Sequence, residues 1–389
     1  MDNKKFQTGN VITIAFAHFF HDVYSAFLAP MLPLLREKLS LNYTLMSLLF
    51  VFQRLPSLFN PLIGIIAENI KVRYLVILSP AVTTVCMSLL GLSGNYILLI
   101  LLLFTVGISS AFFHVPTPVL MKRMAGNRLG KGMSFYMIGG EAARTIGPLV
   151  ISAAISLWGL EGTYRLIPFG LIASLVLYFK FRNVKITEDI AKKKKEKGIR
   201  ETFIKHRYFF ILIGLVLLFR GFMKSAIVSF LPTYMDEMGQ SLWFGSSSLS
   251  IFEFAGVVGV YLAGSYSDKL GRLKMLYAII FVTPFLMLFF VFVKGFLMLP
   301  VLIFLGFFVL ASTPVMIAMV LEIDKEHQSF LNGVFMTLSF VVTSSTTFLV
   351  GILSDLTDLQ STFKLTSYIG FAAIPVMFLL NKRYKKKIR

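Results

Sequence analysis

The chain has 389 residues, of which 56% are hydrophobic and only 15% are charged. Soluble domains carry about 25% charged residues, so this composition excludes an ordinary soluble domain and indicates a protein embedded in lipid. Cys86 is the single cysteine, which excludes an intramolecular disulfide and a cluster of thiolate metal ligands.

Twelve stretches with almost no charge predict transmembrane α-helices. A bilayer core about 30 Å thick needs roughly 20 apolar residues per helix, and a membrane barrel would instead show short alternating strands. The expected spans are residues 11–35, 44–67, 74–92, 96–120, 133–158, 164–180, 207–235, 243–267, 275–293, 297–321, 330–353 and 363–381.

The net charge of +19 is distributed unevenly along the chain. With the N-terminus inside the cell, the cytoplasmic connectors hold most of the lysines and arginines, with dense clusters at 180–207 and 382–389. The opposite side holds only Arg36, Lys38, Arg165, Lys294 and Lys364. This asymmetry predicts that both termini face the cytoplasm. Topology and attraction to anionic lipid headgroups account for the basic excess, so we expect no nucleic-acid partner.

The long polar connector divides the spans into two groups of six. We predict an N-terminal half at 1–180, a basic cytoplasmic linker at 181–206 and a C-terminal half at 207–389. The halves resemble each other at an offset of about 200 residues, which is typical of transporters built from parallel repeats. The expected fold class is an all-α membrane protein with twelve transmembrane helices in two pseudo-symmetric halves.

A charged loop closes the eighth span. Residues 264–274 fit the pattern G-x-x-x-D-(R/K)-x-G-(R/K)-x-(R/K), which resembles the signature loop of the major facilitator superfamily. The resemblance implies a cytoplasmic gate in which Gly264 permits close helix approach, Asp268 faces a helix N-terminus and Arg272 pairs with an acid across the gate. The alternative is that these are ordinary cytoplasmic charges. The predicted gate residues are Gly264, Asp268, Lys269, Gly271 and Arg272, with a degraded first-half copy at Gly64, Glu68 and Arg73.

Span five carries a glycine-rich run. Gly139-Gly140 and Gly147-Pro148 are similar to the glycine-proline motif of the antiporter branch of the superfamily, although a packing and kink role fits them equally well.

A narrower resemblance rests on three segments of the first half. They are His18-Phe-Phe-His21-Asp22 in span one, residues 107–114 ending in His114, and residues 139–148. Together they resemble the fosmidomycin-resistance family of bacterial efflux transporters, which implies export of a phosphonate in exchange for protons. His18, Asp22 and His114 lie at matching positions. The family usually has uncharged side chains where this chain has Arg54, Glu141 and Arg144.

Seven charged residues are expected near the middle of the bilayer. They are Asp22, Arg54, Glu141, Arg144, Arg220, Lys224 and Glu253. Each costs roughly 2.5 to 3.5 kcal/mol on insertion scales, so each needs a partner, a cavity or a function. His18 and Asp22 are four residues apart and Glu141 and Arg144 three apart, so each pair shares a helix face and is expected to form an ion pair.

Arg220 and Lys224 are also four residues apart, and their like charges favour an acid or an anionic ligand between them. The layer has a surplus of one positive charge, which an anionic substrate would balance. We therefore predict substrate contacts at Arg54, His114, Arg144, Arg220 and Lys224. The alternative is that all seven charges form interhelical salt bridges, and that His114 is a helix-contact histidine.

Asp22 is the expected proton carrier, because burial and nearby cations change the proton affinity of a carboxylate. His18 and His21 would adjust it or relay protons, and Glu141 and Glu253 are further candidates. His18, His21 and Asp22 have a spacing that offers three metal ligands, but no further cysteine or acidic cluster completes a site. We expect no metal and no cofactor beyond the proton gradient.

The sequence therefore predicts a monomeric, proton-coupled transporter of a bacterial inner membrane that exports a small anionic organic compound. The alternative within transport is a multidrug, sugar or cationic-compound exporter whose basic residues are paired structurally. An intramembrane enzyme is a remote alternative, because no G-x-S-x-G elbow or H-E-x-x-H pair is present. A channel or sensor would not require the signature loop.

Overall fold

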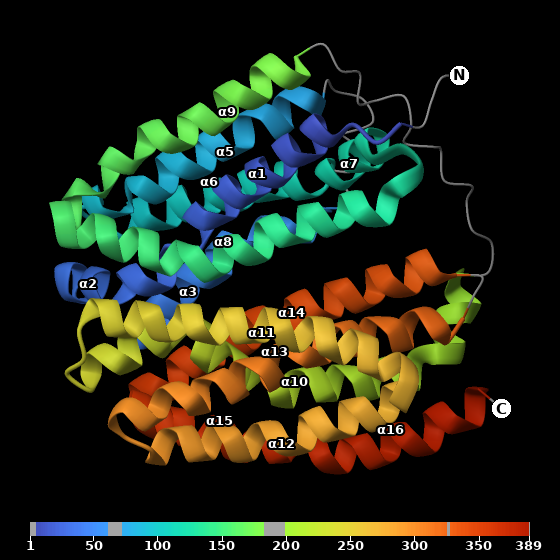
Figure 1. Ribbon diagram of the computed structural model, residues 1–389. Coiled ribbons are helices and arrows are strands. Elements are labelled where there is room, and N and C mark those ends of the chain that lie inside the picture. The colour runs from blue at the N-terminus through green and yellow to red at the C-terminus, as the bar shows by residue number, and fades with distance from the viewer. Residues whose placement is uncertain (1–4, 61–71, 183–198, 325–326, 389) are drawn as a thin grey trace. The chain divides into compact units, whose positions relative to one another are not determined.

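The computed structural model describes residues 5–60, 72–182, 199–324 and 327–388, and all regular elements in these ranges are helices (Figure 1). In the first part of the chain they are α1 (Thr8–Ser25), α2 (Leu28–Leu39), α3 (Tyr43–Arg54), η1 (Leu55–Phe59), α5 (Val72–Ser88), η2 (Leu90–Leu92), α6 (Tyr96–His114), α7 (Thr117–Ala125), η3 (Gly126–Arg128), α8 (Leu129–Trp158), η4 (Glu161–Leu166) and α9 (Ile167–Phe181). In the second part they are α10 (Ile199–Glu237), α11 (Leu242–Leu270), α12 (Arg272–Phe292), η6 (Gly295–Leu297), α13 (Met298–Glu322), α14 (Gln328–Leu356), α15 (Leu359–Phe371) and α16 (Ala373–Ile388).

Ten helical segments among the described residues are long and apolar enough to cross a membrane. The predicted span at 44–67 begins as α3 and η1, and its remaining positions, 61–67, lie outside the described residues. The predicted span at 133–158 is a continuous helix, α8, whose Glu141 and Arg144 lower its mean hydropathy. The cytoplasmic end of the second expected span, at 44–67, therefore stays a prediction.

Three further spans expected as single helices are interrupted. The chain turns between α1 and α2, between α6 and α7 and between α15 and α16. A proline lies at or shortly after each interruption, namely Pro30, Pro116 and Pro375. Proline lacks the N–H that the helix ladder needs and disfavours the helical conformation of the preceding residue. These prolines explain why the hydrophobic runs are longer than the helices that they form.

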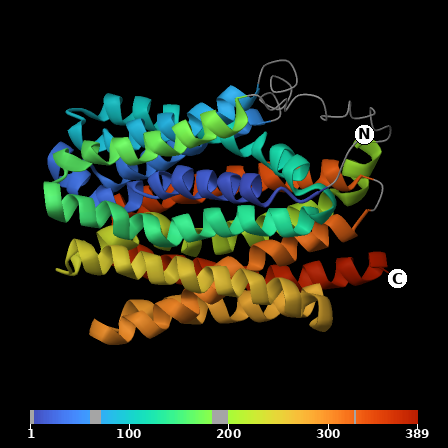
Figure 2. The same ribbon diagram turned by 45° about the horizontal axis from the view of Figure 1, so that its top comes forward.

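The described chain divides into two compact units. Unit 1 comprises Met1–Leu41, Leu48–Lys192 and Met235–Ser250, and unit 2 comprises Asn42–Ser47, Lys193–Tyr234 and Ile251–Arg389. In both views the helices of each unit run in roughly one common direction (Figure 2). Most of the expected linker at 181–206 lies outside the described residues, so its boundaries stay a prediction.

Glycines bring equivalent helices together in both units. In unit 1, a Cβ at Gly107 of α6 would lie 2.3 Å from the backbone oxygen of Gln53. In unit 2, a Cβ at Gly306 of α13 would lie 2.2 Å from the backbone oxygen of Phe252. Both residues of the second contact lie about 200 residues after those of the first, as expected for a duplicated half. Only glycine permits so close an approach.

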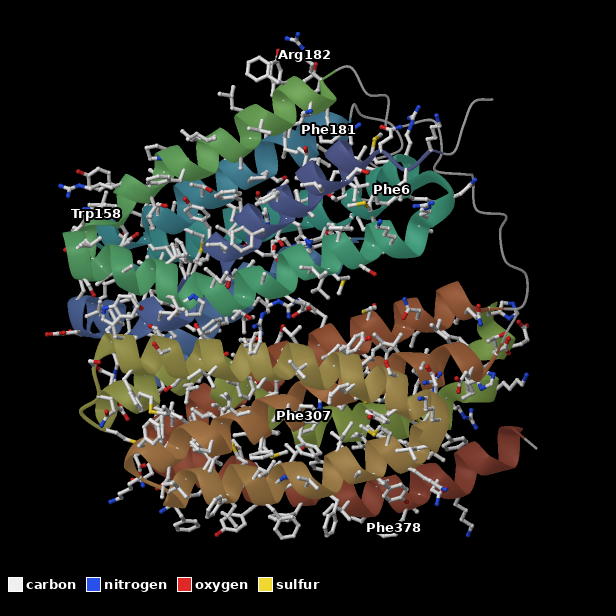
Figure 3. All side chains as sticks on the ribbon, in the orientation of Figure 1. Phe6, Trp158, Phe181, Arg182, Phe307 and Phe378 are labelled. Atoms are coloured by element: carbon white, nitrogen blue, oxygen red, sulfur yellow. The ribbon has the colours of Figure 1, made fainter. Side chains whose placement is uncertain are left out.

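Large apolar side chains cover the outer surfaces of both units. Leu157 is 72% exposed, Phe292 61% and Phe378 64%, and Figure 3 shows the Phe378 ring pointing away from its unit. A soluble protein would rarely expose so many aromatic side chains. The surface therefore fits a lipid environment, as the sequence predicts for most of the phenylalanines.

Candidate functional site

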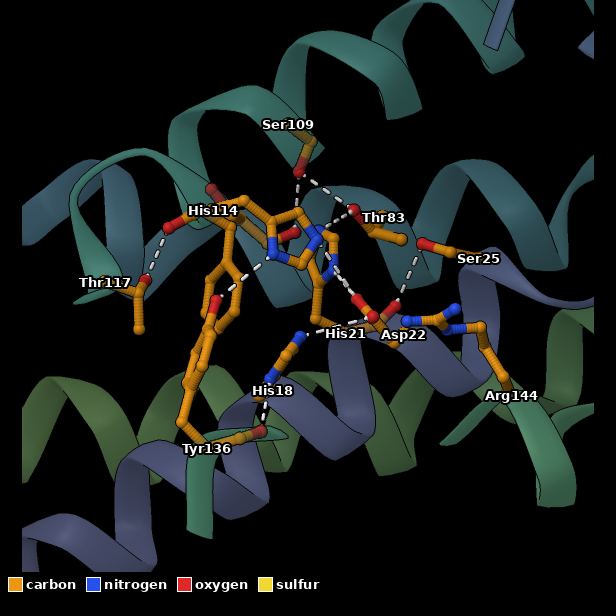
Figure 4. Close-up of polar contacts among 12 residues, drawn as sticks. His18, His21, Asp22, Ser25, Thr83, Ser109, His114, Thr117, Tyr136 and Arg144 are labelled. Carbon is orange, nitrogen blue, oxygen red and sulfur yellow. Dashed lines mark hydrogen bonds and ion pairs between the residues drawn. The ribbon is translucent and has the colours of Figure 1, made fainter. Parts of the chain in front are cut away.

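Three histidines surround the Asp22 carboxylate in unit 1 (Figure 4). His18 Nε2 lies 3.2 Å from Asp22 Oδ2, and His21 Nδ1 lies 2.8 Å from Asp22 Oδ1. His114 Nε2, at the C-terminal end of α6, lies 3.2 Å from the same Oδ1. We call these four residues the Asp22 cluster. Two helices, α1 and α6, bring it together.

The Asp22 cluster is largely enclosed. The side chains of His18 and His21 are 7% and 0% exposed and that of Asp22 13%, whereas that of His114 is 36% exposed. The His21 ring stacks on Phe113 with centroids 4.7 Å apart. His114 is therefore the most exposed member of the cluster.

Tyr136 of α8 supports two of the histidines. Its backbone oxygen lies 2.7 Å from His18 Nδ1, and its ring stacks on the His18 ring with centroids 3.9 Å apart. Its hydroxyl lies 3.2 Å from His114 Nδ1. The close approach depends on Gly140, where a Cβ would lie 2.5 Å from His18 Cε1. Sequence reasoning did not select Tyr136, since nothing in the chain marks it as a neighbour of His18.

A hydroxyl chain from α5 and α6 supports the third histidine. His21 Nε2 lies 3.1 Å from Thr83 Oγ1, which lies 2.9 Å from Ser109 Oγ. Ser109 in turn donates to the backbone oxygen of Ser79 at 2.8 Å. Thr83, Ser109 and Ser79 are all buried, so these hydrogen bonds are shielded from bulk water. These residues were also missed by the sequence analysis.

The predicted ion pair of α8 is present. Arg144 donates to Glu141 Oε1 at 2.9 Å, with the Arg144 side chain 49% exposed. Figure 4 shows the Arg144 side chain extending toward the side of the Asp22 cluster. Arg54, at the end of α3, places its guanidinium 5.7 Å from the centre of the Phe50 ring. The substrate contact expected at Arg54 stays a prediction.

In unit 2, the Arg220 guanidinium is buried on α10 and donates to the backbone oxygen of Val309 on α13 at 3.0 Å. Lys224 lies one turn further along α10 and is partly buried, and Glu253 is buried on α11. The expectation that the charges of both halves meet in one layer stays a prediction. The substrate roles of Arg220 and Lys224 and the proton-coupling role of Glu253 stay predictions as well.

The signature loop links α11 to α12 within unit 2. Gly271 has φ +92°, a backbone conformation that favours glycine. Arg272 contacts Asp268 at 2.5 Å, Glu322 at 3.0 Å and Ser267 Oγ at 2.6 Å. A Cβ at Gly264 would meet nothing within 4 Å among the described residues, and the close helix approach expected there stays a prediction. Lys269 closes α11.

Part of the predicted gate lies outside the described residues. Gly64 and Glu68 fall within 61–71, and Arg73 belongs to α5 although its side chain is not described. The first-half copy of the gate therefore stays a prediction.

A second histidine–aspartate cluster lies in unit 2, between the start of α10 and the loop after α13. Asp324 Oδ2 lies 3.2 Å from His206 Nε2 and 3.5 Å from Lys205 Nζ. Asp324 Oδ1 lies 3.6 Å from His327 Nδ1, which also contacts the Thr202 hydroxyl at 3.1 Å. With the Asp22 cluster, this group accounts for all five histidines of the chain. The sequence analysis did not foresee it, because its members are far apart along the chain.

The residues His18, Asp22 and His114 also meet the distance condition for a metal site, since one ligand atom from each lies within 4.8 Å of the others. The same atoms make the hydrogen-bonding contacts described above, and these contacts need only protons between them. The absence of a metal stays a prediction.

Comparison with known proteins fits this architecture. A profile described as Major Facilitator Superfamily matches residues 14–347. The chain belongs to the major facilitator superfamily. It is 23% identical to the fosmidomycin resistance protein of Escherichia coli over 378 residues. This alignment covers 96% of this chain and 93% of that relative. It is also 24% identical to the multi-drug resistance efflux pump PmrA of Streptococcus pneumoniae, over 57% of this chain and 56% of PmrA.

Solved structures of other members show the same fold. A bacterial homologue of the human lysosomal transporter Spinster aligns with a TM-score of 0.84 at 13% identity, over 99% of each chain. The nucleoside transporter NupG aligns with a TM-score of 0.76 at 13% identity, over 96% of this chain and 99% of NupG. The predicted major facilitator fold is confirmed. As a member of this superfamily, the chain is a multi-pass membrane transporter of small molecules. The members of the superfamily are transporters and not enzymes.

Proposed function

We propose that this major facilitator protein is a proton-coupled exporter of a small anionic organic compound, acting by alternating access in a bacterial inner membrane with both termini in the cytoplasm. The observation that carries the proposal is the Asp22 cluster. A carboxylate in contact with three imidazoles is a group whose charge changes with each proton that it gains or loses. Such a group inside a transmembrane helix is the expected carrier of a coupling proton.

Location supports the same role. Asp22 and its two neighbouring histidines lie on α1, one of the membrane-spanning helices, and their side chains are nearly enclosed. His114 links this enclosed group to the accessible surface. A proton that enters at His114 therefore reaches Asp22 through one contact of 3.2 Å. Glu141 on α8 is paired with Arg144 and remains a second candidate.

The substrate class rests on Arg144 and on the relatives. The guanidinium of Arg144 is half exposed and holds a carboxylate, Glu141, at 2.9 Å. A guanidinium binds carboxylates and phosphonates through the same paired N–H groups, so an anionic substrate competes with Glu141 for it. A relative over nearly the whole chain is named for resistance to fosmidomycin, which makes a phosphonate the first substrate to test.

The test uses the purified protein in liposomes with an acidic lumen. We expect labelled fosmidomycin to accumulate inside as protons leave, and we expect Asp22→Asn to abolish this accumulation while the protein stays folded. Glu201→Gln, at an exposed position in the first turn of α10, is the control and should keep full activity. Unchanged accumulation with Asp22→Asn would remove Asp22 from the mechanism.

A second assay separates the substrate classes. Phosphonates and lipophilic cations are added in turn to the same liposomes, and proton efflux is followed with a pH-sensitive dye. Efflux driven by phosphonates supports the anion exporter. Efflux driven only by lipophilic cations would favour a multidrug exporter, to which the partial similarity with PmrA points.

A further inference from the structure

The hydrogen atoms around His21 have one consistent arrangement. The Ser79 backbone oxygen can only accept, so the single hydroxyl hydrogen of Ser109 must point to it. The contact between Thr83 and Ser109 then needs the Thr83 hydrogen. With its hydrogen used, Thr83 can only accept from His21 Nε2. His21 Nε2 therefore carries a hydrogen.

The same reasoning applies to His18. Its Nδ1 lies 2.7 Å from the backbone oxygen of Tyr136, which can only accept. His18 Nδ1 therefore carries a hydrogen. In both histidines the nitrogen that faces away from Asp22 is the protonated one.

This arrangement decides what faces the carboxylate. A neutral imidazole has one N–H and one lone pair, so neutral His18 and His21 would each point a lone pair at an Asp22 oxygen. At 3.2 Å and 2.8 Å, two facing lone pairs repel. Each contact becomes a hydrogen bond only when a further proton is bound between its two atoms, either to the ring nitrogen or to the carboxylate oxygen.

His114 is different. The Tyr136 hydroxyl can donate to His114 Nδ1, which leaves a hydrogen on His114 Nε2 to donate to Asp22. A neutral His114 is therefore satisfied without a further proton. Other titratable or charged groups on these helices include Tyr24 of α1, Tyr74 and Cys86 of α5, Tyr96 of α6, and Lys131, Tyr136, Glu141 and Arg144 of α8.

We infer that the Asp22 cluster holds two exchangeable protons, one in the His18–Asp22 contact and one in the His21–Asp22 contact, and that Tyr136, Thr83 and Ser109 are positioning residues that create these two places by fixing the histidine tautomers. The bearing on transport rests on the proposed function, whereas the hydrogen positions rest on the contacts alone. The consequence is a stoichiometry of two protons for each substrate exported.

Nuclear magnetic resonance tests the hydrogen positions directly. The chain has five histidines, so protein labelled with ¹⁵N-histidine in lipid nanodiscs gives few ring signals, which single histidine substitutions assign. We expect hydrogen on Nε2 of His21 and on Nδ1 of His18. A neutral His21 with its hydrogen on Nδ1 would overturn the inference, whatever the protein transports.

Thr83→Val and Thr83→Ser form the matched pair. Valine keeps the shape of threonine and removes the acceptor of His21 Nε2–H, so the His21 hydrogen moves to Nδ1 and bonds Asp22 without a further proton. Serine restores the acceptor and should restore the native tautomer. A variant that only loosened the packing would not move the hydrogen between ring nitrogens. An unchanged His21 tautomer in Thr83→Val would therefore refute the positioning role of Thr83.

The proton number is tested by substrate accumulation at several pH gradients. The logarithm of the accumulation ratio rises with the gradient with a slope that equals the number of protons exchanged, after correction for substrate charge. We expect two for the native protein and for Thr83→Ser, and one for Thr83→Val. A native slope of one would overturn the two-proton inference. Loss of all gradient-driven accumulation in the native protein would instead contradict the proposed function. The tautomer measurement would then still decide where the hydrogen atoms of His18 and His21 lie.

Discussion

Gly140→Ala is the substitution that most directly challenges the account of the Asp22 cluster. The new Cβ would lie 2.5 Å from His18 Cε1 and 2.7 Å from His18 Nε2. Ordinary contact between such atoms needs about 3.5 Å, so the His18 ring must move by roughly 1 Å. The His18 ring is also stacked on the Tyr136 ring, with centroids 3.9 Å apart. A shift of this size breaks the 3.2 Å contact between His18 and Asp22.

The energetic cost follows from three contributions. Overpacking a tight interior costs about 1–3 kcal/mol, and losing a hydrogen bond to a charged group costs about 1.5–3 kcal/mol. Alanine in a helix regains about 0.5–1 kcal/mol relative to glycine. The net destabilisation is therefore about 2–5 kcal/mol. A loss of about 2 kcal/mol at the His18–Asp22 contact corresponds to a roughly 30-fold lower occupancy by its proton.

Two assays measure these effects. The buried Cys86 is the only thiol, so a thiol-reactive dye reports unfolding and gives the Tm, and liposome uptake gives the transport rate. Gly130→Ala is the matched control, since it lies on the same helix and its new Cβ would meet no atom of the described residues within 4 Å. We expect Gly140→Ala to lower both Tm and acid-driven uptake, and Gly130→Ala to lower neither. If the two variants behave alike, the packing of His18 against α8 does not support the site.

Two further predictions concern local backbone structure. Gly271→Ala places a Cβ at φ +92° and should cost about 1–3 kcal/mol. Gly264→Ala, in the same motif, meets no described atom within 4 Å and should leave the Tm unchanged or slightly raised. Equal Tm values for the two variants would contradict the strained conformation. Asp358→Ala removes the N-cap of α15 and should cost about 1 kcal/mol at neutral pH. Hydrogen bonds from the Ser361 side chain and backbone hold the Asp358 pKa below its usual value, so the cap stabilises above about pH 4 and is lost as the pH falls through the folded-state pKa. The Tm difference between native protein and variant should therefore shrink in acid, and a constant difference would exclude this cap.

The sequence was sufficient for features that depend on one helix. The spacing of Glu141 and Arg144 predicted their ion pair, and the spacing of His18 and Asp22 predicted a shared face, because helical geometry alone determines both. Hydrophobic runs predicted the spans in the same way, although they did not show where proline interrupts a helix.

Partners on different helices could not be predicted. His114 lies 92 positions after Asp22 in the chain, and only the packing of α6 near α1 brings them to 3.2 Å. The acceptors of His18 and Arg220 are backbone oxygens, which every residue carries and no motif marks. No sequence pattern marks the hydroxyl chain from Thr83 to Ser79 either, since serine and threonine are common in membrane helices.

The glycine contacts have a consequence for how the protein moves. Where α6 meets Gln53 and α13 meets Phe252, one backbone lies directly against another with no side chain between them. Helices so close cannot slide past each other without a steric clash, since interiors packed at this density transmit displacement instead of absorbing it. We expect these helix pairs to travel as rigid bodies during the transport cycle, with the flexing confined to the interruptions near Pro30, Pro116 and Pro375.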